Sequence, residues 1–120
     1  MASGKIRGGI GAYSTAQWTA TSSSAVGTEV TGRLELEAGE YLIVGATATS
    51  SSDINPFALY SNVTGWGRVP NMFYAGNYST AYTFHVTLPT AGYVVLKIQS
   101  STATTYSNAE RGMFRAIRIR

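Results

Sequence analysis

The 120-residue chain contains no cysteine, one histidine and one aspartate, and charged residues make up only 12% of it. The absence of cysteine excludes a disulfide framework, a thiolate metal site and a cysteine nucleophile. The charged fraction is about half that of an average soluble domain. Serine, threonine, glycine and tyrosine take the place of the missing charges. This composition is typical of β proteins on cell or virion surfaces and untypical of helical enzymes.

The same shortages make a catalytic or metal site difficult to assemble. A serine nucleophile would depend on His85 and Asp53, and the sequence has no G-x-S-x-G motif around a serine. Glu35 and Glu37 alternate on one expected strand, about 7 Å apart, which leaves glycoside hydrolysis as a minor alternative. Asp53 and Asn55 offer too few oxygens for calcium. We therefore predict a non-enzymatic protein with no catalytic residue, metal or cofactor.

The length suggests one domain. We expect an N-terminal arm or linker over residues 1–12 and the folded domain over 13–120. No stretch approaches the roughly 20 apolar residues of a membrane-spanning helix. The opening residues "MASGKIRGGIGAY" lack the apolar segment of a secretory signal. The sequence predicts no membrane insertion.

Alternation of apolar and polar residues with a period of two recurs along the chain and predicts β-strands. The expected strands are 13–19, 31–37, 40–50, 57–61, 72–75, 80–88, 93–100 and 112–120. The strands at 80–88 and 93–100 are expected to pair as a hairpin across the "PTAG" turn. The segment 40–50 is apolar on both faces, so both faces are expected to be covered. Many short strands separated by turn-rich segments predict a sandwich or barrel.

Three segments resemble the C1q-like and tumour-necrosis-factor-like domains: "LELEAGEYLIVGATATSS", "TLPTAGYVVLKIQSS" and "FRAIRIR". The last of these resembles the final strand of that family. The resemblance implies an all-β fold, a jelly-roll β-sandwich of about 8–10 antiparallel strands that assembles as a compact homotrimer. Similar domains form the heads of phage and bacterial surface fibres and decorate capsids.

The C-terminal stretch "GMFRAIRIR" has three arginines in its last six residues. Such a basic end can bind nucleic acid through phosphate contacts. Here the arginines alternate with Ile117 and Ile119, which indicates a strand and predicts no nucleic-acid partner. In the implied trimer, the two isoleucines would face the sandwich core. The opposite face of the strand would contact neighbouring subunits, with Glu35, Glu37, Glu110 or a bound anion neutralising Arg118. The candidate interface residues are Phe114, Ala116, Arg118, Arg120, Glu35 and Glu37.

The segment from Phe57 to Tyr82 is rich in aromatic residues and poor in charge. Aromatic rings stack on sugar rings, and asparagine amides bond their hydroxyls. The candidate ligand-binding residues are Trp66, Arg68, Asn71, Asn77 and Tyr78. The alternative is that these rings fill the core and a subunit interface.

These observations predict a structural or interaction domain: a trimeric head of a phage or surface fibre, or a virion decoration, located on the virion or at the extracellular surface. The expected partners are further copies of the chain, a cell-surface glycan or protein receptor, or capsid and tail proteins. A carbohydrate-binding module that uses the loop aromatics is the alternative, and a hydrolase is third.

Overall fold

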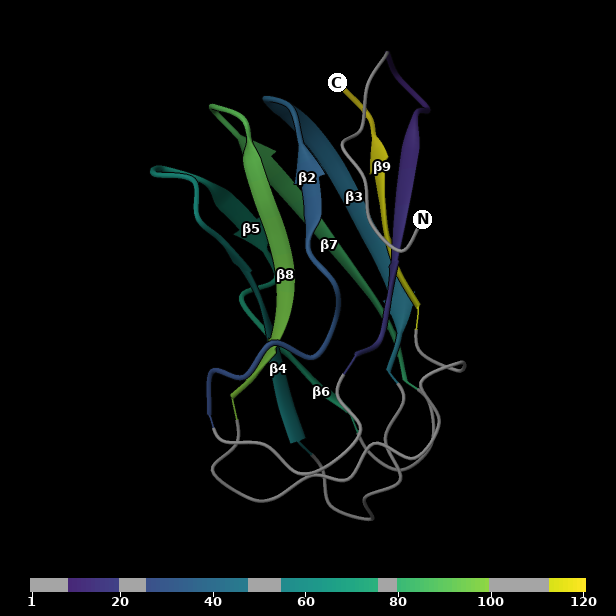
Figure 1. Cartoon of the computed structure of the whole chain (residues 1–120), viewed down its shortest axis with the longest axis vertical. Helices are drawn as coiled ribbons and strands as arrows, with labels where there is room; N and C mark the ends of the chain where they lie inside the picture. Colours follow the sequence, from purple (N-terminus) through teal and green to yellow (C-terminus); the bar gives the residue numbers. More distant parts are fainter. Residues whose placement is uncertain (1–8, 20–25, 48–54, 76–79, 100–112) are drawn as a thin grey trace.

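The computed structural model describes residues 9–19, 26–47, 55–75, 80–99 and 113–120 (Figure 1). These residues form an all-β fold of nine strands, which agrees with the predicted class and number. The strands are β1 (Tyr13–Gln17), β2 (Leu34–Leu36), β3 (Gly39–Ala46), β4 (Asn55–Ser61), β5 (Gly67–Val69), β6 (Phe73–Ala75), β7 (Ala81–Leu88), β8 (Gly92–Ile98) and β9 (Met113–Arg118). No helix within these ranges has the length and apolar character needed to cross a membrane.

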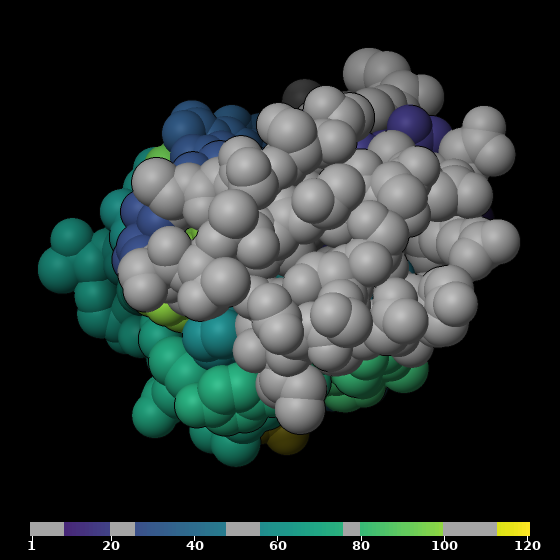
Figure 2. Space-filling model, turned by 90° about the horizontal axis from the view of Figure 1, so that it is seen from below, coloured from purple at the N-terminus to yellow at the C-terminus, as the bar shows by residue number. Residues whose placement is uncertain are grey.

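The strands form two antiparallel sheets that pack face to face. The five-stranded sheet has the order β1-β9-β3-β7-β5, and the four-stranded sheet has the order β2-β8-β4-β6. Each successive strand from β1 to β9 lies in the opposite sheet; without the short edge strand β5, only β4 and β6 would follow one another in the same sheet. This alternation is the winding of a jelly roll, with the first and last strands side by side. The end-on view in Figure 2 places β1 (purple) and the β4–β6 segment (teal to green) on opposite sides of the molecule.

The chain crosses between the sheets after β7, so the predicted hairpin of 80–88 with 93–100 is wrong. β7 pairs with β3 and β5, whereas β8 pairs with β2 and β4. Only three residues, 89–91, connect β7 to β8 across the end of the sandwich. The alternating pattern of each strand suits either arrangement, because in both one face of the strand is buried.

The core lies between the sheets and is built by the alternation that the sequence shows. Along β7, buried and exposed residues alternate without exception, from exposed Ala81 to buried Leu88. Aromatic rings fill the centre: Phe73 stacks on Tyr82 with ring centroids 4.9 Å apart and lies at 5.6 Å from Phe57. Phe84 meets the edge of Phe73 at 5.8 Å. The alternative, that the aromatic rings between Phe57 and Tyr82 fill the core, is correct for Phe57, Phe73 and Tyr82.

A segment before β2 joins the two sheets along one side. The Val30 amide donates to the Leu96 carbonyl of β8 at 2.9 Å, and the Thr19 amide just beyond β1 donates to Val30 at 2.8 Å. Thr31 is buried, and its Oγ1 accepts a hydrogen bond from the Leu96 amide. These bonds extend the pairing to residues that precede β2. They link the β1 side of one sheet to β8 of the other sheet.

Candidate functional site

The C-terminal strand β9 presents the opposite faces from those predicted. Phe114 and Ala116 are fully buried in the sandwich core, whereas Ile117 and Ile119 lie half-buried on the outer face. The prediction that Phe114 and Ala116 contact neighbouring subunits is therefore wrong. Both faces of β9 carry apolar residues, and the face with the large aromatic ring is the one buried, because the ring removes more apolar area from water. Gly45 lies directly opposite Phe114, and its inward side is occupied by the Tyr82 hydroxyl and the Met113 carbonyl.

The terminal arginines are bound to acidic residues of the same chain. Arg118 lies 3.6 Å from the Glu37 carboxylate and donates a 3.0 Å hydrogen bond to the Ala38 carbonyl. Arg120 lies 3.6 Å from Glu40. One of the predicted partners of Arg118 is thus found, but within the chain, and it does not require a neighbouring subunit. Glu110 lies outside the described residues.

The backbone of the C-terminal strand continues to pair to its last residue. The Glu40 amide donates to the Arg120 carbonyl at 2.9 Å, and the Ile119 amide donates to the Glu40 carbonyl at 2.9 Å. Gly39 makes this close approach possible, because a Cβ there would lie 2.7 Å from the Arg120 carbonyl oxygen. The interpretation of "GMFRAIRIR" as a strand is confirmed for residues 113–118 and extends by hydrogen bonding to Arg120.

The outer face of the five-stranded sheet carries aliphatic residues where a solvated face would be polar. The register aligns Tyr13, Ile117, Leu42, His85 and Val69 in one row across all five strands. In this row Tyr13 and Val69 are exposed by 64% and 68%. We call the central patch on β3 and the C-terminal strand the aliphatic stripe; it comprises Leu42, Val44, Ile117 and Ile119, all half-buried.

Few charges interrupt this outer face. Arg115 lies in the same row as Val44, with its Nε donating to Thr15 Oγ1 at 3.0 Å and its guanidinium 4.8 Å from the centre of the Tyr13 ring. At the other end, the Glu40 carboxylate lies 3.3 Å from His85 Nε2. The sequence predicts that both faces of the segment 40–50 are covered. Tyr41 and Ile43 are buried on the core side, whereas the outward residues of β3 are only partly buried.

Three of the predicted ligand-binding residues lie together at the β5 edge. The Arg68 guanidinium lies 4.8 Å above the Trp66 ring, and Arg68 Nε donates to the Asn71 carbonyl at 2.9 Å. Trp66 is partly buried and packs against the core. Arg68 thus covers part of the ring that a sugar would stack on. Asn77 and Tyr78 lie outside the described residues, as does Asp53.

The outer face of the four-stranded sheet carries a second cluster, which sequence reasoning missed. Arg33 forms a bidentate pair with Glu29, at 2.9 and 2.7 Å, and lies 4.1 Å above the Tyr93 ring. Lys97 lies 3.7 Å above Tyr60. The hydrogen bond from Arg33 lowers the pKa of Glu29. The alternation of 93–100 did place Tyr93 and Lys97 on one face, but only the sheet order brings β2 and β4 beside them.

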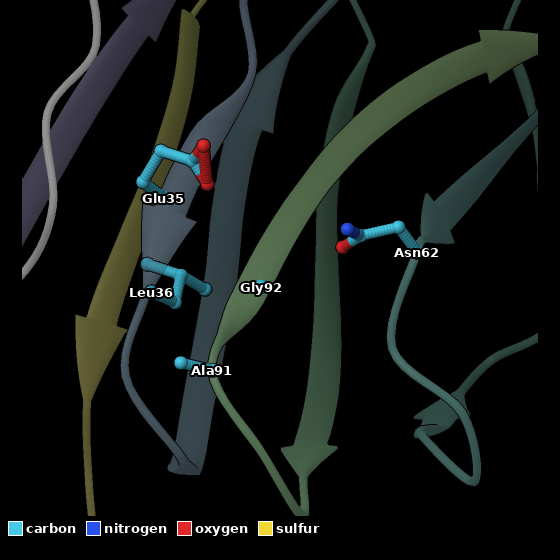
Figure 3. A pocket seen from close by; sticks show the side chains of 5 residues that line it. All are labelled: Glu35, Leu36, Asn62, Ala91 and Gly92. Carbon is cyan, nitrogen blue, oxygen red and sulfur yellow. The ribbon is translucent and has the colours of Figure 1, made fainter.

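A hollow of about 430 Å³ lies next to this cluster, at the end of the sheet where β8 begins (Figure 3). Its lining comes from β2, from the residue after β4 and from the start of β8: Glu35, Leu36, Asn62, Ala91 and Gly92. Glu35 lies on the four-stranded sheet, away from the C-terminal strand of the same chain, and its role at a contact between subunits stays a prediction.

The residues that could carry catalysis or metal binding are dispersed. Among the described residues, no three histidine, cysteine, aspartate or glutamate side chains gather at one point. His85 contacts Glu40 on the five-stranded sheet, while Glu35 lies on the other sheet.

Comparisons with protein families, with curated proteins and with solved structures find no match for this chain. The functional argument therefore rests on its own surfaces.

Proposed function

We propose that this chain is a non-enzymatic interaction domain that self-associates through the outer face of its five-stranded sheet, as a homotrimer. The carrying observation is the aliphatic stripe, Leu42, Val44, Ile117 and Ile119, on the outer face of the sheet, where the row through Leu42 and Ile117 ends in the exposed Tyr13 and Val69. Contiguous apolar surface of this kind marks an interaction site in soluble proteins. The jelly-roll strand order supports the resemblance to C1q-like and tumour-necrosis-factor-like domains, from which the trimeric state is taken.

The chemistry of this face favours a second copy of the chain over a charged partner. Its centre is aliphatic, and its two charged groups nearest the stripe, Arg115 and Glu40, already have partners within the chain. A symmetric assembly buries the same patch of every copy. Aliphatic side chains at the centre and a polar rim are the usual anatomy of such an interface.

The setting that fits this proposal is the surface of a virion or the extracellular surface, as a fibre head or decoration. Its remaining partners would be a receptor or the capsid and tail proteins that carry it. The composition, poor in charge and rich in hydroxyl and tyrosine side chains, supports this assignment.

Sedimentation and light scattering test the oligomeric state. The wild-type protein should have three times the 12.8 kDa monomer mass across micromolar concentrations. Ile117→Glu should give a monomer with an unchanged far-UV circular dichroism spectrum, because the residue lies outside the core. Leu42→Lys, on the neighbouring strand β3, is a second variant and should also give a monomer.

Tyr74→Glu is the matched control, since Tyr74 is 63% exposed on the four-stranded sheet and should leave the mass unchanged. A monomeric wild-type protein would refute self-association. A dimer that Ile117→Glu dissociates would retain the surface and refute the trimer.

A further inference from the structure

Two polar side chains, Glu35 and Asn62, border the hollow beside β8, and both have hydrogen-bonding capacity that the described residues do not use. Asn62 Oδ1 accepts a 2.8 Å bond from the Tyr93 amide, which identifies the oxygen and leaves the amide nitrogen as a donor. The Glu35 carboxylate is exposed and makes no hydrogen bond or ion pair among the described residues. Figure 3 shows these two side chains on either side of the start of β8, with Asn62 pointing toward it. A donor and an acceptor therefore border the same hollow.

The positions of both groups are fixed by the sheet. Glu35 pairs with Tyr93 and Leu36 pairs with Gly92 in the β2–β8 ladder. Gly92 is required at this point, because a Cβ there would collide with the Val63 side chain and lie 2.6 Å from Asn62 Oδ1. The close packing of Asn62 against β8 and its bond to the Tyr93 amide hold the Asn62 amide in one orientation. A site held in this way loses little entropy when a ligand binds.

The chemistry of the hollow matches a neutral polyhydroxylated ring. Each hydroxyl of a sugar both donates and accepts, so neighbouring hydroxyls can donate to the Glu35 carboxylate and accept from the Asn62 amide. Ala91 and Gly92 supply apolar lining for the C–H face of the ring. An anion is disfavoured by the carboxylate, and a divalent cation needs more oxygen ligands than one carboxylate and one amide provide.

We propose that this hollow, bordered by Glu35 and Asn62, binds one ring of a neutral saccharide. Its volume of about 430 Å³ lies within the range of small-molecule sites. It lies on the four-stranded sheet, whereas the aliphatic stripe lies on the outer face of the other sheet, so both surfaces can be used together. The saccharide site does not depend on the oligomeric state, and either proposal can fail alone.

Saturation-transfer difference NMR tests the site with the methyl glycosides of glucose, galactose, mannose and N-acetylglucosamine. At least one should show saturable binding to the wild-type protein. Glu35→Gln retains the size of the side chain but loses the charged acceptor, and should weaken binding about tenfold. Asn62→Asp retains the oxygen that accepts from Tyr93 and removes the donor, and should weaken binding by a similar factor. Circular dichroism and thermal unfolding should show both variants folded.

Glu29→Gln is the matched control, because it removes a carboxylate from the same sheet away from the hollow, and its affinity should equal that of the wild-type protein. Trp66→Ala distinguishes this site from the cluster of Trp66, Arg68 and Asn71 at the β5 edge, and this variant should bind the glycosides as the wild-type protein does. Three results would overturn the proposal: no binding of any of the four glycosides to the wild-type protein, unchanged affinity in both Glu35→Gln and Asn62→Asp, or an equal loss in Glu29→Gln or Trp66→Ala.

Discussion

Gly45 provides the sharpest test of the core packing, because a single methyl group added there has no space. Gly45 lies in the middle of the five-stranded sheet, between Tyr82 on β7 and Phe114 on β9. Its inward side is crossed by the Tyr82 side chain, whose hydroxyl donates a 2.5 Å bond to the Met113 carbonyl. A Cβ at position 45 would collide with that carbonyl oxygen and lie 2.5 Å from the Tyr82 hydroxyl.

The expected loss of stability in Gly45→Ala is the sum of two costs. Met113 presents a backbone atom in a paired strand, so relief of the clash must shift the β3–β9 ladder, at a cost of about 1–3 kcal/mol for overpacking. The shift also disturbs a hydrogen bond to a hydroxyl that is buried, as the raised pKa of Tyr82 reflects. A buried polar group left without its partner costs roughly 1–3 kcal/mol more. We expect Gly45→Ala to lower the free energy of unfolding by about 2–5 kcal/mol.

Equilibrium urea denaturation, followed by tryptophan fluorescence and circular dichroism, measures this change. Gly67→Ala is the control, because a Cβ at Gly67 meets nothing within 4 Å, and we expect a change within about 0.5 kcal/mol. Tyr82→Phe removes the hydroxyl and should cost about 1 kcal/mol alone. The double variant should cost less than the sum of the two single changes, because they share one contact. A Gly45→Ala protein as stable as the Gly67→Ala control would refute the reasoning.

Two further predictions concern charges. Arg33 lowers the pKa of Glu29 below its ordinary value of 4.5, so this pair contributes stability above that pH and loses it as the pH falls further. The urea midpoint of Glu29→Gln should therefore depend less on pH, between neutral and acidic solution, than that of the wild-type protein. The control variant Glu35→Gln should show the same pH dependence as the wild-type protein. An equal pH dependence in Glu29→Gln and the wild-type protein would contradict a stabilising Arg33–Glu29 pair. Arg118→Met should reduce the free energy of unfolding by about 1 kcal/mol, because it removes the hydrogen bond to the Ala38 carbonyl. Arg120→Met should change the free energy of unfolding by less than about 0.5 kcal/mol, because the Arg120 side chain is 82% exposed. Equal urea midpoints for the two arginine variants would contradict this ranking.

The positions of the long strands could be predicted because alternation with a period of two is a local property. The expected strands at 80–88 and 112–120 correspond to β7 and β9 within one or two residues. β5 was missed, because three residues that begin with Gly67 and end before Pro70 show a turn and no alternation. It forms only because β7 offers a free edge beside it.

Partners in the sheets could not be predicted in the same way. A turn of three residues after β7 is compatible with a hairpin and with a crossing between sheets, and the alternation of Val94, Leu96 and Ile98 is the same in both. The choice depends on contacts between residues far apart in sequence, such as the pairing of β8 with β2. The hollow and its two polar side chains depend on that pairing, so no local signal placed Asn62 beside Glu35.

The inverted faces of the C-terminal strand show how this missing information bears on function. The sequence alternates two residue sets there, Phe114 with Ala116 and Ile117 with Ile119, and both sets are apolar enough to be buried. One sandwich core can accept only one set, and the set with the large aromatic ring, Phe114 with Ala116, is fully buried. The other set then remains outside, in register with Leu42 on a strand that is apolar on both faces. A sheet with two apolar faces needs cover on both, and among the described residues the sandwich core fully buries only the inner face. The requirement for the second cover is the physical reason to expect that this domain functions as an assembly.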